Sequence, residues 1–112
     1  MKVEHRLREN RDFRRVFNRG RSSATDKLVL YWARNRGSNF RVGFSVSRKV
    51  GNAVQRNLIK RRLRACFDRF LPELLGKPAD FVVVCRKNAS QATYQQLEND
   101  VLRLLKRAKF MI

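Results

Sequence analysis

The sequence predicts a single α+β domain in which helices pack on a small mixed sheet. At 112 residues the chain is long enough for one packed core and too short for a second. Segments of helical and strand periodicity follow one another in the order αββαβα, with no repeat, linker or low-complexity stretch between them. One domain should therefore span residues 1–112, with its helices covering one side of the sheet.

The first predicted helix begins near Asn10, which can cap it, and ends at Gly20. Within it Phe13, Val16 and Phe17 share one face at the spacing i, i+3, i+4. Aromatic residues at this spacing more often belong to a core than to a binding site. The pattern alone leaves both roles open for the two phenylalanines.

Two segments rich in β-forming residues predict a hairpin, residues 28–34 (LVLYWAR) and 40–47 (FRVGFSVS), joined by a polar turn. In the second segment apolar residues alternate with small or polar ones, which places Ser45 and Ser47 on the face opposite the core. A core role and a binding role both stay open for two aromatic residues of the first segment, Tyr31 and Trp32.

The longest predicted helix runs from Gly51 to about Leu71. At about 100° per residue its apolar side chains fall within one arc, formed by Ile59, Leu63, Cys66, Phe67 and Phe70. Residues 80–86 are nearly all apolar, which is typical of a strand buried on both faces. Ser90 or Thr93 can cap a final helix, whose core stripe comprises Tyr94, Leu97, Val101, Leu104, Leu105 and Ala108.

The charge of the chain indicates a polyanionic partner. Lys and Arg number 27 against 9 Asp and Glu, a formal net charge of +18. Nucleic acid is the leading partner, because its condensed counterions are released when Lys and Arg replace them. A membrane surface is the alternative, but no apolar run approaches the roughly 20 residues of a spanning helix. The N-terminus lacks the apolar segment of a secretory signal, so a cytoplasmic location is expected.

The positive charge is densest between Arg48 and Arg69, where eight basic residues accompany one acidic residue. On the predicted helix one polar face is formed by residues at i, i+3, i+4 and i+7, namely Asn57, Lys60, Arg61 and Arg64. A solvated face normally mixes charge signs, so this stripe indicates a surface that follows phosphates. The alternative is a basic helix that is merely soluble. The preference for Arg over Lys favours structured RNA.

Catalytic constellations are missing from the sequence. His5 is the sole histidine and lies in an N-terminal arm expected to be mobile, so no acid and base pair can be assembled around it. Cys66 and Cys85 lack CxxC spacing and have apolar neighbours, which predicts buried reduced thiols rather than a disulfide or metal ligands. No metal-binding or nucleotide-binding motif is present. The chain by itself is not expected to be an enzyme.

Residues 45–67 (SVSRKVGNAVQRNLIKRRLRACF) closely resemble the signature segment of the bacterial ribonuclease P protein family, whose core is called the RNR motif. Four further segments fit the family: DFRRVFNRG at 12–20, VLYWAR, FRVGFSV, and RKNAS before a helix that contains a tyrosine. The resemblance covers essentially the whole chain. Gln55 departs from the commoner family pattern, which is often basic or polar there, and should be tolerated.

The resemblance implies two sets of RNA-binding residues. Contacts with the catalytic RNA subunit are implied for Arg56, Asn57, Lys60, Arg61 and Arg64. The single-stranded 5′ leader of precursor tRNA is implied to bind a cleft formed by Phe13, Phe17, Tyr31, Arg48, Lys49, Arg86 and Lys87. The face that carries Ser45 and Ser47 could be the floor of this cleft. Such a cleft suits single strands of any sequence, because every base can stack and every linkage is charged.

The resemblance also implies the fold and the reaction. The fold would resemble the second domain of ribosomal protein S5, with a left-handed βαβ crossover. The activity would be tRNA 5′-end maturation by a ribonucleoprotein endonuclease, with one protein per RNA. The RNA subunit would perform the hydrolysis with Mg²⁺ that it mainly holds itself, and the protein would have no intrinsic cofactor and be inactive alone. The rivals are a ribosomal or general RNA chaperone protein, against which the RNR segment argues, and an autonomous ribonuclease, which would need catalytic groups not found here.

Overall fold

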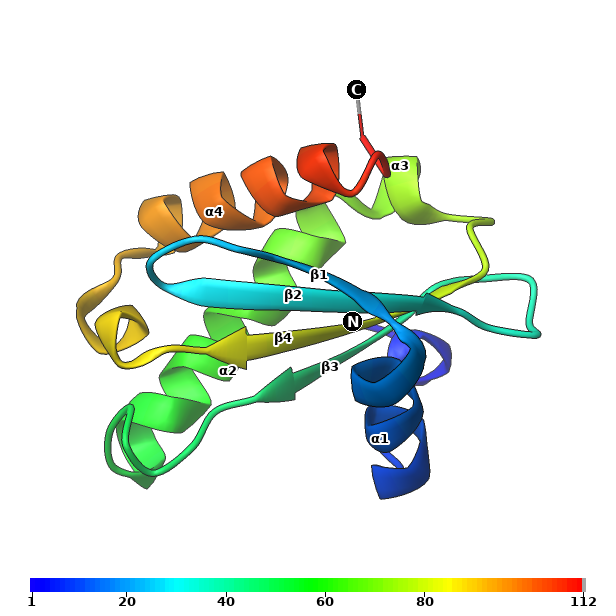
Figure 1. The fold of residues 1–112 in the computed structure, drawn as a ribbon. Helices are drawn as coiled ribbons and strands as arrows, with labels where there is room; N and C mark the ends of the chain where they lie inside the picture. The colour runs from blue at the N-terminus through cyan, green and yellow to red at the C-terminus, as the bar shows by residue number, and fades with distance from the viewer. Residues whose placement is uncertain (112) are drawn as a thin grey trace.

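A mixed sheet of four strands forms the centre of the protein (Figure 1). The computed structural model describes residues 1–111. The strands stand in the order β1-β2-β4-β3, with β4 antiparallel to β2 and parallel to β3. Their bounds are β1 Arg21–Ala24, β2 Leu28–Arg34, β3 Arg41–Ser45 and β4 Ala79–Cys85.

The predicted hairpin between residues 28–34 and 40–47 is wrong. Both segments are strands, but β4 lies between them and pairs with each. The reason is burial: β4 is buried on both faces along almost its whole length, and the central position is the one that covers both faces. The outer neighbour of β2 is instead β1, a mostly exposed RSSA segment whose sequence has no apolar alternation to reveal it.

Within residues 1–111, four α-helices and two short 3₁₀ segments complete the fold. The longest, α2, begins at a capping box in which Asn52 and Gln55 exchange hydrogen bonds of 2.9 Å. Thr93 caps α4 in the same way, as one of the two predicted alternatives. Asn10 is the first residue of α1 rather than its cap, which is Glu9. The bounds are η1 Val3–His5, α1 Asn10–Arg19, α2 Ala53–Arg69, α3 Leu71–Leu74, η2 Lys87–Gln91 and α4 Tyr94–Arg107.

The helices cover both faces of the sheet, whereas the sequence predicted one side only. α2 and α4 pack on the face that holds the main core, built from side chains such as Leu30, Leu63, Phe81 and Leu104. α1 packs on the opposite face, where Val16 is buried in a smaller cluster that also holds Leu7 and Val82. Figure 1 shows α1 on one side of the strands and α2 on the other. The sheet residues that face α1 are few and combine apolar with polar side chains, so their pattern did not predict this second layer.

The connection from β3 through α2 to β4 is a left-handed crossover. In Figure 1 both strands point to the left, β4 lies above β3, and α2 passes behind them. This handedness is the one implied by the resemblance to the second domain of ribosomal protein S5. It breaks the usual rule for parallel strands.

The N-terminal segment closes the outer edge of β3. Arg6 forms a parallel bridge with Val42, and the amide of Leu7 donates to the Val42 carbonyl at 3.0 Å. His5 is buried, with its ring stacked on Phe40 at a centroid distance of 4.3 Å and Nδ1 3.0 Å from the Phe40 carbonyl oxygen. The expectation that His5 lies in a mobile arm is therefore wrong.

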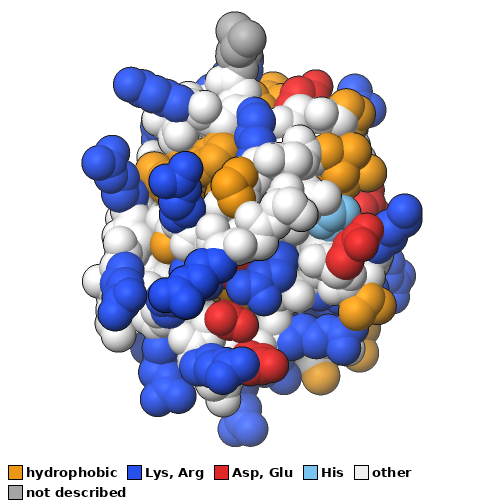
Figure 2. Space-filling view, turned by 90° about the vertical axis from the view of Figure 1, so that its right-hand side faces the viewer, with side chains coloured by type: hydrophobic (Ala, Val, Ile, Leu, Met, Phe, Trp, Pro, Cys, Tyr) orange, Lys and Arg blue, Asp and Glu red, His pale blue; other side chains and the backbone are white. Residues whose placement is uncertain are grey.

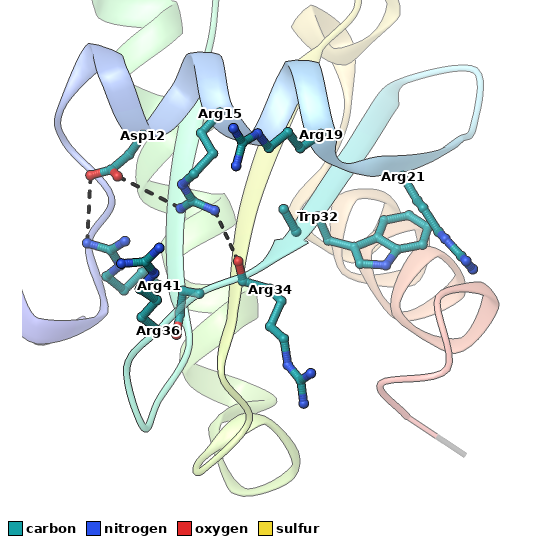
Figure 3. Close-up of a pocket in the computed structure, with 10 residues that line it drawn as sticks. Asp12, Arg15, Arg19, Arg21, Trp32, Arg34, Arg36 and Arg41 are labelled. Atoms are coloured by element: carbon teal, nitrogen blue, oxygen red, sulfur yellow. Dashed lines mark hydrogen bonds and ion pairs between the residues drawn. The ribbon is translucent and has the colours of Figure 1, made fainter.

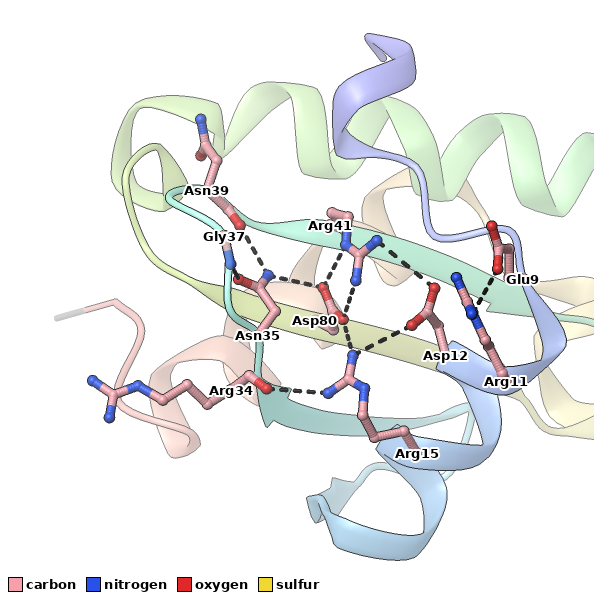
Figure 4. A network of polar contacts seen from close by, with 10 residues as sticks. All are labelled: Glu9, Arg11, Asp12, Arg15, Arg34, Asn35, Gly37, Asn39, Arg41 and Asp80. Atoms are coloured by element: carbon pink, nitrogen blue, oxygen red, sulfur yellow. Dashed lines mark hydrogen bonds and ion pairs between the residues drawn. The ribbon is translucent and has the colours of Figure 1, made fainter.

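A buried carboxylate ties α1 to the start of β3 and β4 (Figure 4). Asp80 is fully buried and accepts two hydrogen bonds from Arg41, at 2.9 and 2.7 Å, and one from Asn35 at 2.9 Å. Arg15 of α1 donates to the same carboxylate and to the carbonyl of Arg34. Burial opposes ionisation of Asp80, but the hydrogen bonds from Arg41 and Asn35 outweigh it and lower its pKa.

Candidate nucleic-acid interface

Three aromatic side chains lie between α1 and the sheet. Phe17 is 40% exposed and meets Tyr31 of β2 edge to face, with ring centroids 4.9 Å apart. Phe13, one helical turn earlier, lies against Gly43 of β3, where a Cβ atom would come within 2.8 Å of its ring. An exposed Phe17 is not simply a core residue. Phe13 also lines a hollow beside β3, and the surface that Phe13 forms with Phe17 and Tyr31 is called the aromatic groove below.

The floor of this groove runs along one face of the sheet. Tyr31 and Gly43 are both paired with Val82, so they lie in one row beneath α1. Ser45 lies two residues beyond Gly43 on the same face, paired with the half-buried Val84. Beside the aromatic side chains, Gly43 and Ser45 are small residues, and Ser45 and Val84 are only half-buried.

Four basic residues stand where the floor ends. β3 and β4 are parallel, so the segments that follow them leave the sheet at the same end. Exposed cations occupy both segments, and among residues 1–111 none of them forms an ion pair. They are Arg48, Lys49, Arg86 and Lys87. The seven predicted leader-binding residues therefore lie either on the face of the sheet that α1 covers or at the end where β3 and β4 leave the sheet.

The predicted stripe on α2 is continuous along the helix. Asn57 and Arg61 are exposed, and Arg56, Lys60 and Arg64 are half-buried at successive turns. No acidic side chain pairs with any of them within residues 1–111. Two other basic residues of this segment have structural contacts instead: Arg62 donates to the Ala92 carbonyl at 2.8 Å and Arg69 pairs with Glu98 at 3.3 Å.

The aromatic groove and the basic stripe meet beside β3. Lys60 and Arg64 of α2 line the same hollow as Phe13 and Gly43, a cavity of about 170 Å³. Arg6 and Arg8 of the N-terminal segment complete its rim. The two surfaces were predicted from the sequence as separate sites. In the fold they join as one continuous cationic band around the edge of β3. The signal that could have revealed this is the glycine inside a strand, which often marks a close approach.

The groups that could carry chemistry are buried or engaged. Cys66 and Cys85 are buried, and desolvation raises the pKa of each thiol to about 12. Both thiols are therefore protonated and unreactive at neutral pH. Within residues 1–111 no three His, Cys, Asp or Glu side chains come together as a metal site, and no helix is long and apolar enough to cross a membrane.

Comparison with known proteins agrees with this geometry. The family model described as Ribonuclease P matches residues 1–109. The ribonuclease P protein component of Halalkalibacterium halodurans is 41% identical over 112 residues, which cover 99% of this chain and 93% of the relative. That of Bacillus cereus is 40% identical over 110 residues, covering 96% and 94%.

Solved structures show the same fold. The Staphylococcus aureus RNase P protein superposes with a TM-score of 0.88 at 38% identity, covering 96% of this chain and 98% of that one. The RNase P protein from Thermotoga maritima gives a TM-score of 0.82 at 35% identity, covering 91% and 96%. The chain belongs to the ribonuclease P protein family.

Gln55 has a local structural role at the start of α2. Its side chain accepts from the Asn52 amide and closes the capping box of α2. The basic stripe begins immediately after this box, at Arg56. Gln55 thus helps to fix the end of the helix that carries the stripe.

Proposed function

We propose that this chain is the protein subunit of a bacterial ribonuclease P, which removes 5′ leaders from precursor tRNA. The observation that carries the proposal is the cationic band that joins the aromatic groove to the α2 stripe beside β3. A single-stranded leader would lie in the groove, its bases on Phe17 and Tyr31 and its linkages near the four cations at the sheet end. The catalytic RNA subunit would lie along α2.

The protein would position RNA rather than cleave it. Phosphates near the α2 stripe would be held by unpaired cations, which also reduce the repulsion between the two RNA chains. Fixing the leader next to the RNA subunit would lower the entropic cost of bringing the scissile linkage into place. Hydrolysis itself is assigned to the RNA subunit, in a cytoplasmic complex with one protein per RNA.

Magnesium is assigned to the RNA subunit because the groove of this chain does not fit it. Mg²⁺ prefers oxygen ligands, especially carboxylates, and the residues that form the groove contribute none. The nearest carboxylates on α1 and β4, Asp12 and Asp80, lie on the other flank of α1 and are engaged by Arg15 and Arg41. No step of the reaction is therefore assigned to a metal held by this protein.

Reconstitution tests the proposal. Precursor tRNA is incubated with the protein alone, with a bacterial ribonuclease P RNA alone, and with both, in the same magnesium buffer. We expect cleavage at the mature 5′ end to be fastest with both, under salt conditions where RNA alone is slow, and the stimulation to weaken at high salt. Robust cleavage by the protein alone would refute the assignment of catalysis to the RNA. No stimulation of the RNA by folded protein would refute the subunit role.

A further inference from the structure

A second hollow lies on the other flank of α1, at an open edge of the sheet. β1 pairs with β2 only as far as Arg21 opposite Trp32, so within residues 1–111 no strand lies outside the last two residues of β2. A cavity of about 640 Å³ occupies this place, between α1 and the turn that follows β2 (Figure 3). It faces away from the aromatic groove, because Asp12, Arg15 and Arg19 lie on the flank of α1 opposite Phe13 and Phe17.

The hollow is lined by six arginines, and four of them are free. Arg15 and Arg41 each pair with Asp12 and Asp80, and within residues 1–111 no other carboxylate pairs with either arginine. The other four are exposed, and within residues 1–111 their side chains form no ion pair or hydrogen bond. These four are Arg19, Arg21, Arg34 and Arg36. Figure 2, which shows the end of the molecule near this turn, has Lys and Arg side chains spread over it with few acidic ones among them.

An indole stands beside these guanidinium groups. The side chain of Trp32 lies next to that of Arg21 and lines the hollow (Figure 3). Its ring also meets Phe110 edge-on at a centroid distance of 6.4 Å, which anchors it on the core side. Trp32 is only half-buried. An anchored, partly exposed aromatic face next to cations is the arrangement on which nucleic-acid bases stack.

We propose that this hollow is a second RNA-binding site, which holds phosphates with the four free arginines and places an unpaired base against Trp32. Guanidinium groups bind phosphate oxygens through two parallel hydrogen bonds. The four unpaired positive charges repel one another, and a bound polyanion reduces this repulsion. An acidic peptide would satisfy the charges but would not use the indole. The site goes beyond the leader groove and the α2 stripe, and it can be tested on the protein alone.

Trp32 provides the readout, because it is the sole tryptophan of the chain. The probe is a short single-stranded oligoadenylate, titrated into the protein while the intrinsic fluorescence of Trp32 is followed. We expect a saturable change in emission. The double substitution Arg34→Ala with Arg36→Ala should weaken this binding roughly tenfold, as expected for the loss of a charge-assisted contact. It should also lower the salt slope.

A second double variant controls for net charge. Arg103 and Lys106 are exposed on α4 and form no ion pair within residues 1–111, so changing both to Ala removes the same charge elsewhere. We expect it to affect the Trp32 response much less. Arg34→Lys with Arg36→Lys keeps the charge and should weaken binding in part, because the fork is lost. Thermal melts of each variant establish that it is folded.

Three results would overturn the site. These are no change in Trp32 emission at RNA concentrations that bind the protein, equal weakening by the two double alanine variants, and equally tight, Arg34-dependent binding of an oligoglutamate of the same charge. Failure here does not bear on the leader groove, since the emission of Trp32 reports on this hollow and not on the groove. In the reconstituted complex the Arg34 and Arg36 double variant identifies the source of the RNA. Weaker binding of the RNA subunit assigns the site to that subunit, and weaker binding of mature tRNA assigns it to the tRNA body.

Discussion

Phe13 and Gly43 are in such close contact that a Cβ atom at position 43 would lie 2.8 Å from a carbon of the phenylalanine ring. The same Cβ would also lie 3.0 Å from the backbone carbonyl of Leu7, which is fixed by its place beside β3. The absent side chain thus lets α1 and the N-terminal segment approach the sheet together. It also sets the position of Phe13 at the junction of the groove and the α2 stripe.

Gly43→Ala should therefore destabilise the fold and disturb the groove. Forcing one methyl group into a filled space costs about 1 to 3 kcal/mol. Denaturant unfolding measures this loss, and leader affinity should fall with it. Adding Phe13→Ala should recover part of the stability, because the ring that meets the new methyl is gone. Strict additivity of the two substitutions would show that the two positions do not interact.

Phe17→Ala should weaken the binding of precursor tRNA to the reconstituted complex and leave mature tRNA unaffected. Base stacking on an aromatic side chain contributes about 1 to 3 kcal/mol per base, and mature tRNA has no leader to lose. Because Phe17 is 40% exposed, the substitution should cost little stability. Binding is measured with leaders of increasing length, and melting of the variant is measured alongside. Equal losses for precursor and mature tRNA in a folded variant would contradict the leader assignment.

Arg64→Ala should have the opposite selectivity. Arg64 belongs to the α2 stripe and has no ion-pair partner within residues 1–111. Its loss should therefore weaken binding of the RNA subunit and should affect precursor and mature tRNA equally. A lost phosphate contact should also reduce the salt slope of binding by about one. Arg103→Ala on α4 is the matched control. If both variants show the same loss, the stripe acts only through net charge.

Most of the fold could be predicted from the sequence because its strongest patterns are local. The α2 and α4 stripes and the apolar β4 follow from periodicity alone. Strand pairing could not be read in this way. The turn between β2 and β3 resembles a hairpin turn, and only the need of β4 for cover on both faces places it between them. β1 escaped prediction because its residues are mostly exposed.

The candidate site was predicted as two lists of residues, and the structure supplies their spatial relation. Lys60 and Phe13 are far apart in sequence but line one hollow, because the left-handed crossover returns α2 beside β3. The arginine hollow could not have been found from the sequence. Its four free arginines come from α1, β1, β2 and a turn, as two i, i+2 pairs that no single helix or strand carries. They lie around one opening because the pairing of β1 with β2 stops at Arg21 and Trp32 and leaves the end of β2 uncovered.

Sulfate or phosphate should raise the melting temperature well beyond what chloride does at equal ionic strength. The net charge of +18 makes the folded chain self-repulsive, and anions bound at organised sites stabilise the folded state by mass action. Circular dichroism melts in matched salts measure the effect. Sucrose, which stabilises by exclusion rather than by binding, is the control for general solvent effects. Equal melting temperatures in sulfate and chloride would show that screening alone is responsible.

The Asp80 network should make the fold sensitive to acid. The pKa of Asp80 is lower in the folded protein than the ordinary aspartate value, so the folded state binds a proton less readily than the unfolded chain. The stability that this difference provides is fully present above the unfolded-state pKa, and it is lost as pH falls through the folded-state pKa. Unfolding free energy measured from neutral pH downward should therefore fall steeply in the acid range. α1 should loosen with it, since Arg15 joins α1 to Asp80.

Asp80→Asn separates this effect from general acid destabilisation. The substitution leaves Arg15 and Arg41 without their buried counter-charge, which should cost about 3 to 5 kcal/mol at neutral pH. The remaining stability should then depend much less on pH in the acid range, because the group that titrates is gone. Asp26→Asn is the matched control, since Asp26 is exposed and within the described residues its carboxylate pairs with Lys27 alone. An acid profile that is as steep in Asp80→Asn as in the unmodified chain would show that other carboxylates govern acid unfolding.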